Sequence, residues 1–323
     1  DTVNAGQLYD KDFNNFAPRV SFAYDVTGKG RTVIRAGWGV FYDAFAQDIF
    51  LGHFPWNCGF CPGPAYTGHG PGTIVGLGLL GGSLSPDAPV FDESPDAVAP
   101  LGEFFGASKN LPTPYVQNFN VNVQQALGSR AVLQVGYVGT KGTKLFRFRD
   151  INQPSLAQIT AADLACVPHP ENESFCPSGY GVPRAFPDAP QFYINQEESA
   201  ASSIYHSLQT TLRMNNWRGI TSQLNFVWSH AIDDASDSED FIPNQAQPTD
   251  SLNPAGERGN SSFDIRRRLT WNLAYELPRF GGSLSKLKNG WGVDSVLSMQ
   301  DGQPFHLNYF FEGDYSGAGQ GFD

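Results

Sequence analysis

Charged residues and methionine are scarce in this sequence, and long apolar runs are missing. Charged side chains make up 16% of the 323 residues and methionine occurs twice, whereas an ordinary soluble domain has about 25% charged residues. The composition argues against a helical bundle, because Phe (25), Tyr (12), Trp (6), Gly (35) and Pro (23) favour strands, turns and loops. The most apolar run, 73–84, is short and interrupted by glycines. No segment therefore has the roughly 18 consecutive apolar residues of a transmembrane helix.

The signals of several functional classes are also missing. A net charge of -11 without a basic stripe excludes a nucleic-acid partner. The six histidines are scattered, and neither the His-x-x-x-His spacing of metalloproteases nor the Gly-x-Ser-x-Gly turn of serine hydrolases occurs. We therefore expect no enzyme. The sequence shows no leader and ends in a Gly-rich stretch, so we expect it to be part of a longer protein.

Alternation of apolar and polar residues with a period of two predicts eight strands. They cover 20–24, 34–42, 119–127, 133–137, 208–214, 220–229, 269–277 and 291–300. Short turns containing glycine join them in pairs, which predicts four antiparallel hairpins in chain order.

Long connections alternate strictly with these short turns. The ranges 43–113, 147–203 and 231–264 together hold 22 acidic and five basic residues, a net charge of -17, whereas the four turns contribute seven basic residues and no acid. Outer-membrane barrels have tight periplasmic turns and long outer loops. We therefore predict that the long loops gather at the rim opposite the turn residues Lys29, Arg130, Arg218 and Lys286.

The alternating residues predict one apolar and one polar face. In a transmembrane barrel the apolar face contacts lipid and the polar face lines a wetted lumen. The predicted lipid-facing band contains Leu133, Val135, Tyr137, Leu208, Leu212, Leu224, Phe226, Leu273 and Tyr275. Interfacial aromatic girdles are predicted at Trp38, Tyr42, Tyr115, Tyr137, Trp228, Trp271 and Trp291. The alternative is a secreted β-sandwich, in which a second sheet covers the same apolar residues.

Seven segments carry a resemblance to a known family. They are Asn15–Tyr24, Arg35–Asp43, Pro114–Asn120, Gly136–Leu145, Trp228–Asp234, Ser262–Leu269 and Gly302–Phe305. In this order they resemble the barrel of the Oar-like TonB-dependent receptors, outer-membrane transporters with an amino-terminal carboxypeptidase-regulatory-like domain. The chain departs from the family at Arg267, where its members usually have His.

The resemblance implies a barrel of about 22 strands, closed by a plug and energised by an inner-membrane TonB-type complex. Residues 1–323 are expected to form part of this one barrel domain, an open curved sheet in the bacterial outer membrane, with the signal peptide, the plug and the end of the barrel absent. Outer-membrane lipid and the TonB-type complex are the implied partners, and no cofactor is implied. The implied function is movement of a substrate too large or too scarce for porins. The alternative function is a secreted or surface β-rich adhesion or carbohydrate-binding module.

Four cysteines lie in the long loops, as Cys58 and Cys61 in the first and Cys166 and Cys176 in the second. The Cys-x-x-Cys spacing has no strand-to-helix context for redox chemistry. The spacings also match no tetrahedral zinc motif well, although His169 is nearby. An oxidising exterior favours two local disulfides, 58–61 and 166–176, among the three possible connectivities.

An acidic cluster in the third loop provides the oxygen ligands that calcium prefers. It comprises Asp233, Asp234, Asp237, Glu239 and Asp240, and its spacing does not match an EF-hand. We interpret it as a solvated acidic loop, with a calcium site as the alternative. The arginines 266–268 that follow are interpreted as lumen and rim charge neutralised by loop carboxylates.

Overall fold

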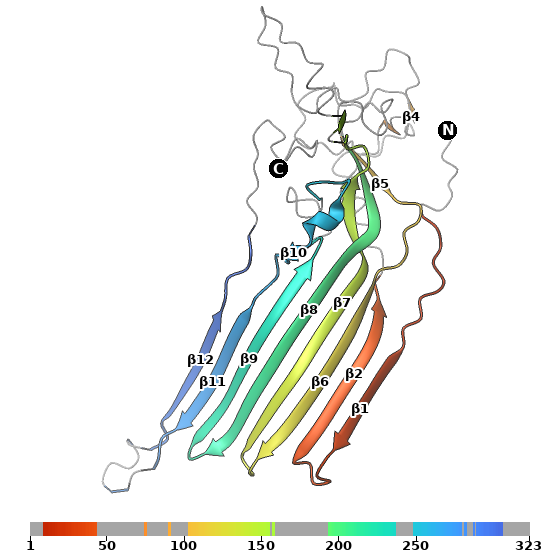
Figure 1. The fold of residues 1–323 in the computed structure, drawn as a ribbon. Helices are drawn as coiled ribbons and strands as arrows, with labels where there is room; N and C mark the ends of the chain where they lie inside the picture. Colours follow the sequence, from red (N-terminus) through yellow and green to blue (C-terminus); the bar gives the residue numbers. More distant parts are fainter. Residues whose placement is uncertain are drawn as a thin grey trace, which may run out of the picture.

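The fold is an antiparallel sheet in which neighbours in sequence are neighbours in space. The computed structural model describes residues 9–43, 74–75, 90–91, 103–155, 157–158, 193–236, 248–279, 281–282, 287 and 289–305. Figure 1 shows the long strands side by side in one inclined, curved sheet, with the short turns at its lower end. Among the described residues, no helix is both long and apolar enough to cross a membrane.

The eight predicted strands all form. They are β1 (Arg19–Asp25), β2 (Thr32–Tyr42), β6 (Tyr115–Leu127), β7 (Ala131–Asp150), β8 (Tyr193–Trp217), β9 (Ile220–Asp233), β11 (Arg267–Glu276) and β12 (Gly292–Gln300). Their order in the sheet is β1-β2-β6-β7-β8-β9-β11-β12. The predicted four hairpins in chain order are therefore confirmed.

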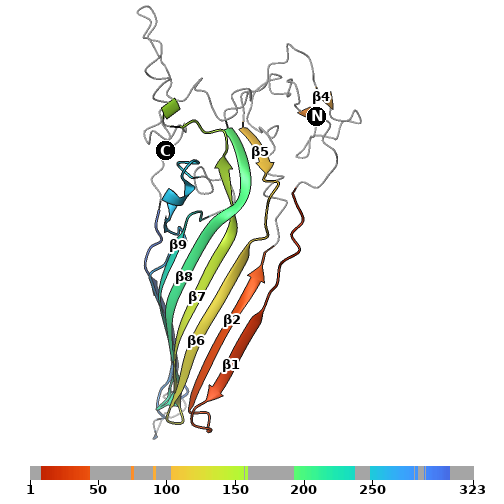
Figure 2. The ribbon, with the colours of Figure 1, turned by 45° about the vertical axis from the view of Figure 1, so that its right-hand side comes forward.

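Shorter elements join the upper end of the sheet. β5 (Glu103–Ala107) pairs in parallel with β8, and β10 (Gly259–Asn260) pairs with β9. A 3-10 helix, η2 (Pro254–Glu257), precedes β10, and β3 (Ile74–Val75) pairs with β4 (Val90–Phe91) apart from the main sheet. Figure 2 shows β5 beside the upper part of β8. This parallel pairing is an exception to the antiparallel arrangement predicted from the sequence.

The tight turns depend on glycine. Gly128 (φ 72°) lies between β6 and β7, and Gly219 (φ 85°) lies between β8 and β9. A Cβ atom at residue 219 would also lie 2.6 Å from the carbonyl oxygen of Glu276. Only glycine adopts this backbone conformation without strain and leaves this space. These two residues therefore fix the sharp reversals at the lower end.

The register separates the two faces as the alternation predicted. Leu133 pairs with Leu212, and Leu212 pairs with Leu224, so the three side chains share one face. The same face extends to both edges of the sheet, where Phe22 of β1 is 58% exposed and Met299 of β12 is 57% exposed.

No second sheet covers this apolar band among the described strands. A sandwich would bury these side chains between two sheets, so the sandwich alternative is not supported. In the part of the chain that the structure describes, the buried apolar residues are few: Val40, Leu111, Phe148 and Ala201.

The two ends of the sheet differ as predicted. Lys29, Arg130 and Arg218 lie in the short turns at the lower end (Figure 1). Asp233 ends β9 at the opposite end, and Asp234 follows it. The predicted separation of basic turns from the acidic segment is confirmed for these residues, whereas Lys286 lies outside the described residues.

The second long loop is shorter than predicted. β7 continues to Asp150 and β8 begins at Tyr193, so 147–150 and 193–203 belong to strands. The alternation is interrupted because the register shifts near Leu145, next to Lys144 in a left-handed conformation (φ 56°). An extra residue in one strand reverses which side chains face inward, so a search for strict alternation stops there.

Candidate functional site

The polar face of the sheet gathers the side chains that can recognise a hydrophilic solute. The strand register aligns these side chains in rows. One row contains Gln134, Thr211, Asn225, Thr270 and Ser298. The next row contains Arg213, Gln223, Asn272 and Val296. We call this face of the sheet, from β1 to β12, the polar wall.

Hydrogen bonds within a strand and between neighbouring strands orient the carboxamides of the polar wall. The Oδ1 atom of Asn225 accepts bonds from the Thr211 hydroxyl (3.0 Å) and from the Gln223 amide (3.1 Å). Arg35 donates to the Oε1 atom of Gln124 over 2.8 Å. Such bonds hold neutral donors and acceptors in fixed directions while their other polar atoms stay available to water or solute.

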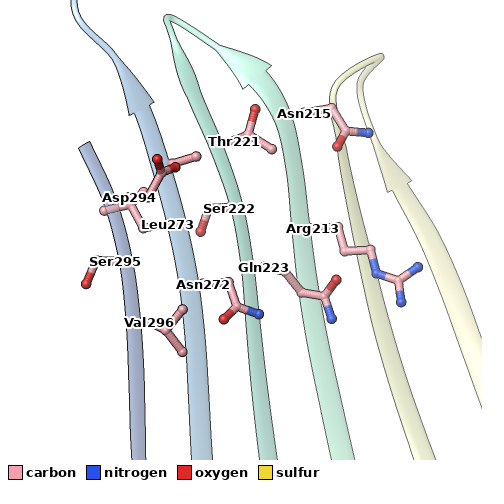
Figure 3. A pocket seen from close by; sticks show the side chains of 11 residues that line it. Arg213, Asn215, Thr221, Ser222, Gln223, Asn272, Leu273, Asp294, Ser295 and Val296 are labelled. Atoms are coloured by element: carbon pink, nitrogen blue, oxygen red, sulfur yellow. The ribbon is translucent and has the colours of Figure 1, made fainter. Parts of the chain in front are cut away.

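A recess of about 430 Å³ lies in the polar wall near the short turns. It is bordered by residues of β8, β9, β11 and β12. Figure 3 shows Arg213 on one side and Asp294 on the other, with Gln223 and Asn272 between them. Its volume falls within the range of small-ligand sites, about 300–1,000 Å³.

Charges on the polar wall are left unneutralised. Arg35, Arg213 and Arg268 are exposed, and none of them forms an ion pair within the described part of the chain. Asp294 is likewise exposed and without an ion-pair partner there. Exposed charges without an ion-pair partner stay available to attract a charged solute. The polar wall therefore suits water-soluble, charged or hydroxyl-rich molecules.

A compact ion-pair cluster lies at the upper end of β7 and β8. Glu198 accepts bonds from the Nε atoms of Arg147 (2.8 Å) and Arg149 (3.0 Å). These pairs link the two strands above the register shift, because Glu198 lies directly opposite Arg147. The Arg147 and Glu198 side chains are largely shielded from water, which strengthens the attraction between them.

Glu197, the residue before this cluster, is fully buried and lies opposite Phe148. Neither of its carboxylate oxygens has a hydrogen-bond partner among the described residues. Burial disfavours the charged carboxylate and raises the pKa of Glu197 to about 7. This group therefore exchanges a proton near neutral pH.

The acidic cluster predicted to bind calcium is only partly described. Asp233 accepts a bond from the Ser236 hydroxyl (2.9 Å). Asp234 accepts bonds from both the backbone amide (2.7 Å) and the hydroxyl (3.0 Å) of Ser202. Asp237, Glu239 and Asp240 lie outside the described residues, and the described residues contain no group of three or more His, Cys, Asp or Glu that could hold a metal ion. The calcium alternative stays a prediction.

The four cysteines also lie outside the described residues: Cys58, Cys61, Cys166 and Cys176. The predicted disulfides therefore stay predictions.

The interpretation of the three arginines was partly wrong. Arg266 pairs with Asp264 (2.7 Å), which belongs to the third connection as predicted. Arg267 instead pairs with Asp301, directly after β12. Its cross-strand partner is Trp228, so Arg267 lies on the apolar face and not in the lumen. Arg268 is on the polar wall but has no carboxylate partner among the described residues. Alternation predicted the correct face for Arg268. Arg267, in contrast, is a charged residue on the face that otherwise carries the apolar residues Leu269 and Trp271.

Two functional residues were not identified from the sequence. Glu197 falls in a range interpreted as loop, and its burial depends on strands that the register shift conceals. Arg213 alternates with the apolar residues of the strand predicted over 208–214, but only the three-dimensional register places it across a recess from Asp294. In the sequence, the position of Arg213 between the apolar residues Leu212 and Met214 indicates that its side chain lies on the polar face of the strand.

Comparison with known proteins gives one family match. A family model described as an outer membrane beta barrel domain matches residues 1–323. No curated protein matches the chain.

Solved structures with a similar arrangement include outer-membrane proteins from two organisms. The outer membrane transporter YddB from Escherichia coli is similar with 10% identity and a TM-score of 0.45, over 88% of this chain and 33% of that one. A mutant of the ferric enterobactin receptor PfeA from Pseudomonas aeruginosa has 11% identity and a TM-score of 0.39, over 81% of this chain and 25% of that one. The siderophore receptor PirA from Pseudomonas aeruginosa has 11% identity and a TM-score of 0.34, over 81% and 31%. The chain thus spans a third or less of the length of these structures.

Proposed function

Because the chain belongs to the outer membrane beta barrel domain family, whose members lie in the bacterial outer membrane, we propose that it forms part of the wall of a TonB-dependent transporter of the Oar-like type. The observation that supports the proposal most strongly is an uncovered apolar band that reaches both edges of a sheet whose other face is polar. An outer-membrane barrel wall contacts lipid with one face and water with the other.

The two free edges support a larger barrel. Among the described strands, β1 pairs only with β2, and β12 pairs only with β11. Unpaired backbone groups are too costly in hydrocarbon, so a membrane sheet must close on itself. Further strands of a longer protein would pair with β1 and β12 and complete the barrel.

In this proposal the short basic turns face the periplasm and the long acidic loops face outward. The substrate is a solute too large or too scarce for porins, and it passes along the polar wall. Energy comes from an inner-membrane TonB-type complex that engages a region outside 1–323. The local disulfides Cys58–Cys61 and Cys166–Cys176 stabilise the outer loops. The acidic cluster of the third loop is a solvated acidic segment, with a calcium site as the alternative.

Edge cross-linking in the full-length protein tests the partial barrel. Ser21 of β1 and Ser298 of β12 both lie on the polar wall. If the eight strands closed alone, β1 would pair with β12, and one of the double variants that combine Ser298→Cys with Arg19→Cys, Ser21→Cys, Ala23→Cys or Asp25→Cys would form a disulfide in the membrane. We expect none. The control Thr211→Cys/Asn225→Cys, directly opposite each other on β8 and β9, is expected to cross-link.

A binding assay tests TonB dependence separately. Full-length protein in lipid nanodiscs is expected to bind the purified periplasmic domain of a TonB-type protein. Deletion of the segment that precedes the plug is expected to abolish this binding while the barrel stays folded. Equal binding with and without that segment would contradict the proposed energy coupling.

A calcium titration of the full-length protein tests the calcium alternative separately. If calcium does not change the protease protection of the long loops, the calcium site is rejected and the transporter proposal is unaffected.

A further inference from the structure

The recess in the polar wall has charges of opposite sign on its two sides. Arg213 lies on β8 and Asp294 on β12, with β9 and β11 between them. Neighbouring strands are about 4.8 Å apart, so the three intervals separate the two residues by about 14 Å across the sheet. The two charges are too far apart to form an ion pair with each other, and none is found between them.

The residues between the two charges are neutral hydrogen-bonding groups. Gln223 and Asn272 occupy the same row as Arg213, and Val296 ends that row on β12 (Figure 3). The side chain of Asn272 makes no hydrogen bond within the described part of the chain, and Gln223 uses only its amide nitrogen. Each carboxamide can therefore still donate or accept a bond. Such groups match the N–H and C=O groups of a peptide backbone.

We propose that this recess binds a short zwitterionic peptide of about four residues, lying across β8 to β12 with its carboxylate at Arg213 and its ammonium group at Asp294. The proposal deepens the proposed function by naming the substrate class, and it rests on the polar wall lining a transport path. The guanidinium of Arg213 holds a carboxylate through two parallel bonds. Gln223 and Asn272 bind the backbone between the two ends.

Length and charge together select this ligand. An extended chain advances about 3.3 Å per residue, so four residues span about 13 Å, close to the roughly 14 Å that separates β8 from β12 across the sheet. A ligand with only negative charge would be repelled by Asp294, and one with only positive charge would be repelled by Arg213. A dipolar ligand of the right length satisfies both groups at once.

Calorimetry with end-blocked peptides tests the assignment. The probes are tetra-alanine, its N-acetylated form and its C-amidated form, titrated into the full-length protein in nanodiscs. Loss of a charge-assisted bond weakens binding by about 10- to 100-fold. We expect wild type to bind tetra-alanine, and each blocked form to bind more weakly by this factor.

The variants assign each end of the peptide to one residue. Arg213→Gln should bind the free and amidated carboxyl ends equally but still distinguish the acetylated peptide. Asp294→Asn should show the reverse. Lys29→Gln, which removes an exposed basic charge from the turn between β1 and β2, outside the recess, should behave as wild type. Unchanged melting of all three variants serves as the folding control.

Several results would overturn the peptide site. Absence of tetra-alanine binding by the wild-type protein would do so, and so would an equal loss of affinity for the two blocked peptides in both variants. A pattern in which only the carboxylate end matters would indicate a simple anion site in place of a peptide site. TonB binding is measured independently, so it distinguishes failure of this site from failure of the transporter proposal.

Discussion

The Tyr137 hydroxyl and the Nδ1 atom of His206 are 2.6 Å apart on the apolar face of the sheet. Their rings are stacked at 6.0 Å between centroids with an interplanar angle of 24°. The ring of Phe119 lies 6.1 Å from Tyr137 and 6.4 Å from His206. An exposed aromatic cluster with a paired polar tip is typical of a membrane interface, where one end is apolar and the other is wet. In the proposed barrel this cluster therefore lies at the upper boundary of the lipid-facing band.

This pair gives the first prediction. Tyr137→Phe removes the hydroxyl and leaves His206 without its partner, which we expect to cost roughly 1 kcal/mol of unfolding free energy. The measurement is denaturant unfolding of the full-length protein in detergent. The double variant Tyr137→Phe/His206→Phe should recover part of the loss, because both polar groups are then gone. Additive losses would mean that the two side chains are not coupled.

The second prediction compares two kinds of ion pair. Glu198→Gln removes the charge that joins Arg147 and Arg149, where the Arg147 and Glu198 side chains are only 9% and 15% exposed. An uncompensated, largely buried arginine is expected to cost roughly 3 kcal/mol of local opening free energy. Hydrogen exchange of the amides of β7 and β8 above the register shift measures it.

The matched control for that prediction is Asp301→Asn. It breaks the bidentate pair with Arg267, whose side chain is 68% exposed. Solvent and salt screen such a pair, so hydrogen exchange in β11 and β12 should change far less. Similar changes for the two variants would show that burial does not govern these pairs.

The third prediction is a pH dependence centred on Glu197. Burial raises its pKa from 4.5 to about 7, so between these values the folded state binds more protons than the unfolded state. Stability at the upper end of β8 is therefore highest below the unfolded pKa, falls as pH rises, and stays low once pH exceeds about 7.

Hydrogen exchange at Ser108 reports on this effect, because its amide donates to the Glu197 carbonyl oxygen over 2.9 Å. Protection is expected to decrease from pH 5 to pH 8 beyond the intrinsic change in exchange rate. Glu197→Gln removes the ionisation and should make protection independent of pH. A pH response that persists in this variant would assign it to another group.

The membrane part of the sheet was predictable because its structure is determined by residues that are close together in the sequence. Lipid on one side and water on the other favour a period of two. In β9, Leu224, Phe226 and Trp228 lie on the apolar face, and Gln223, Asn225 and Ser229 lie on the polar face, where Val227 is the exception. Glycine-containing turns then fix which strands pair. Strand order, hairpin pairing and the end at which each turn lies follow from these patterns alone.

The upper end was not predictable because its stabilising contacts are distant in sequence. Glu198 meets Arg147, 51 residues away, and the backbone amide of Asp150 donates to the Ser251 hydroxyl, 101 residues away. Neither contact produces a periodic pattern in the sequence from which it could be predicted. The recess was not predictable for the same reason. Arg213 and Asp294 belong to different hairpins, and only the pairing register of β9 and β11 brings them to opposite sides of the recess.

The fourth prediction concerns the loop cysteines. Cys166 and Cys176 should form a local disulfide, and Cys58 should pair with Cys61. Proteolysis of non-reduced full-length protein followed by mass spectrometry identifies the linked peptides. Peptides that join residue 58 or 61 to residue 166 or 176 would contradict the local pairing, and free thiols at all four residues would contradict both bonds.

The fifth prediction tests which face of β8 meets lipid, using residues three apart on opposite faces. Leu212 lies in the apolar band between Leu133 and Leu224, whereas Gln209 lies on the polar wall and is exposed. Leu212→Arg places a charge against hydrocarbon, which costs about 2–4 kcal/mol near the bilayer midplane. Gln209→Arg places the same charge toward water, so it should change the unfolding free energy little. Reversible unfolding of the full-length protein from lipid vesicles measures both. If the sheet were inserted with its faces reversed, Gln209→Arg would be the more destabilising substitution; equal effects would mean that neither face contacts lipid at this depth.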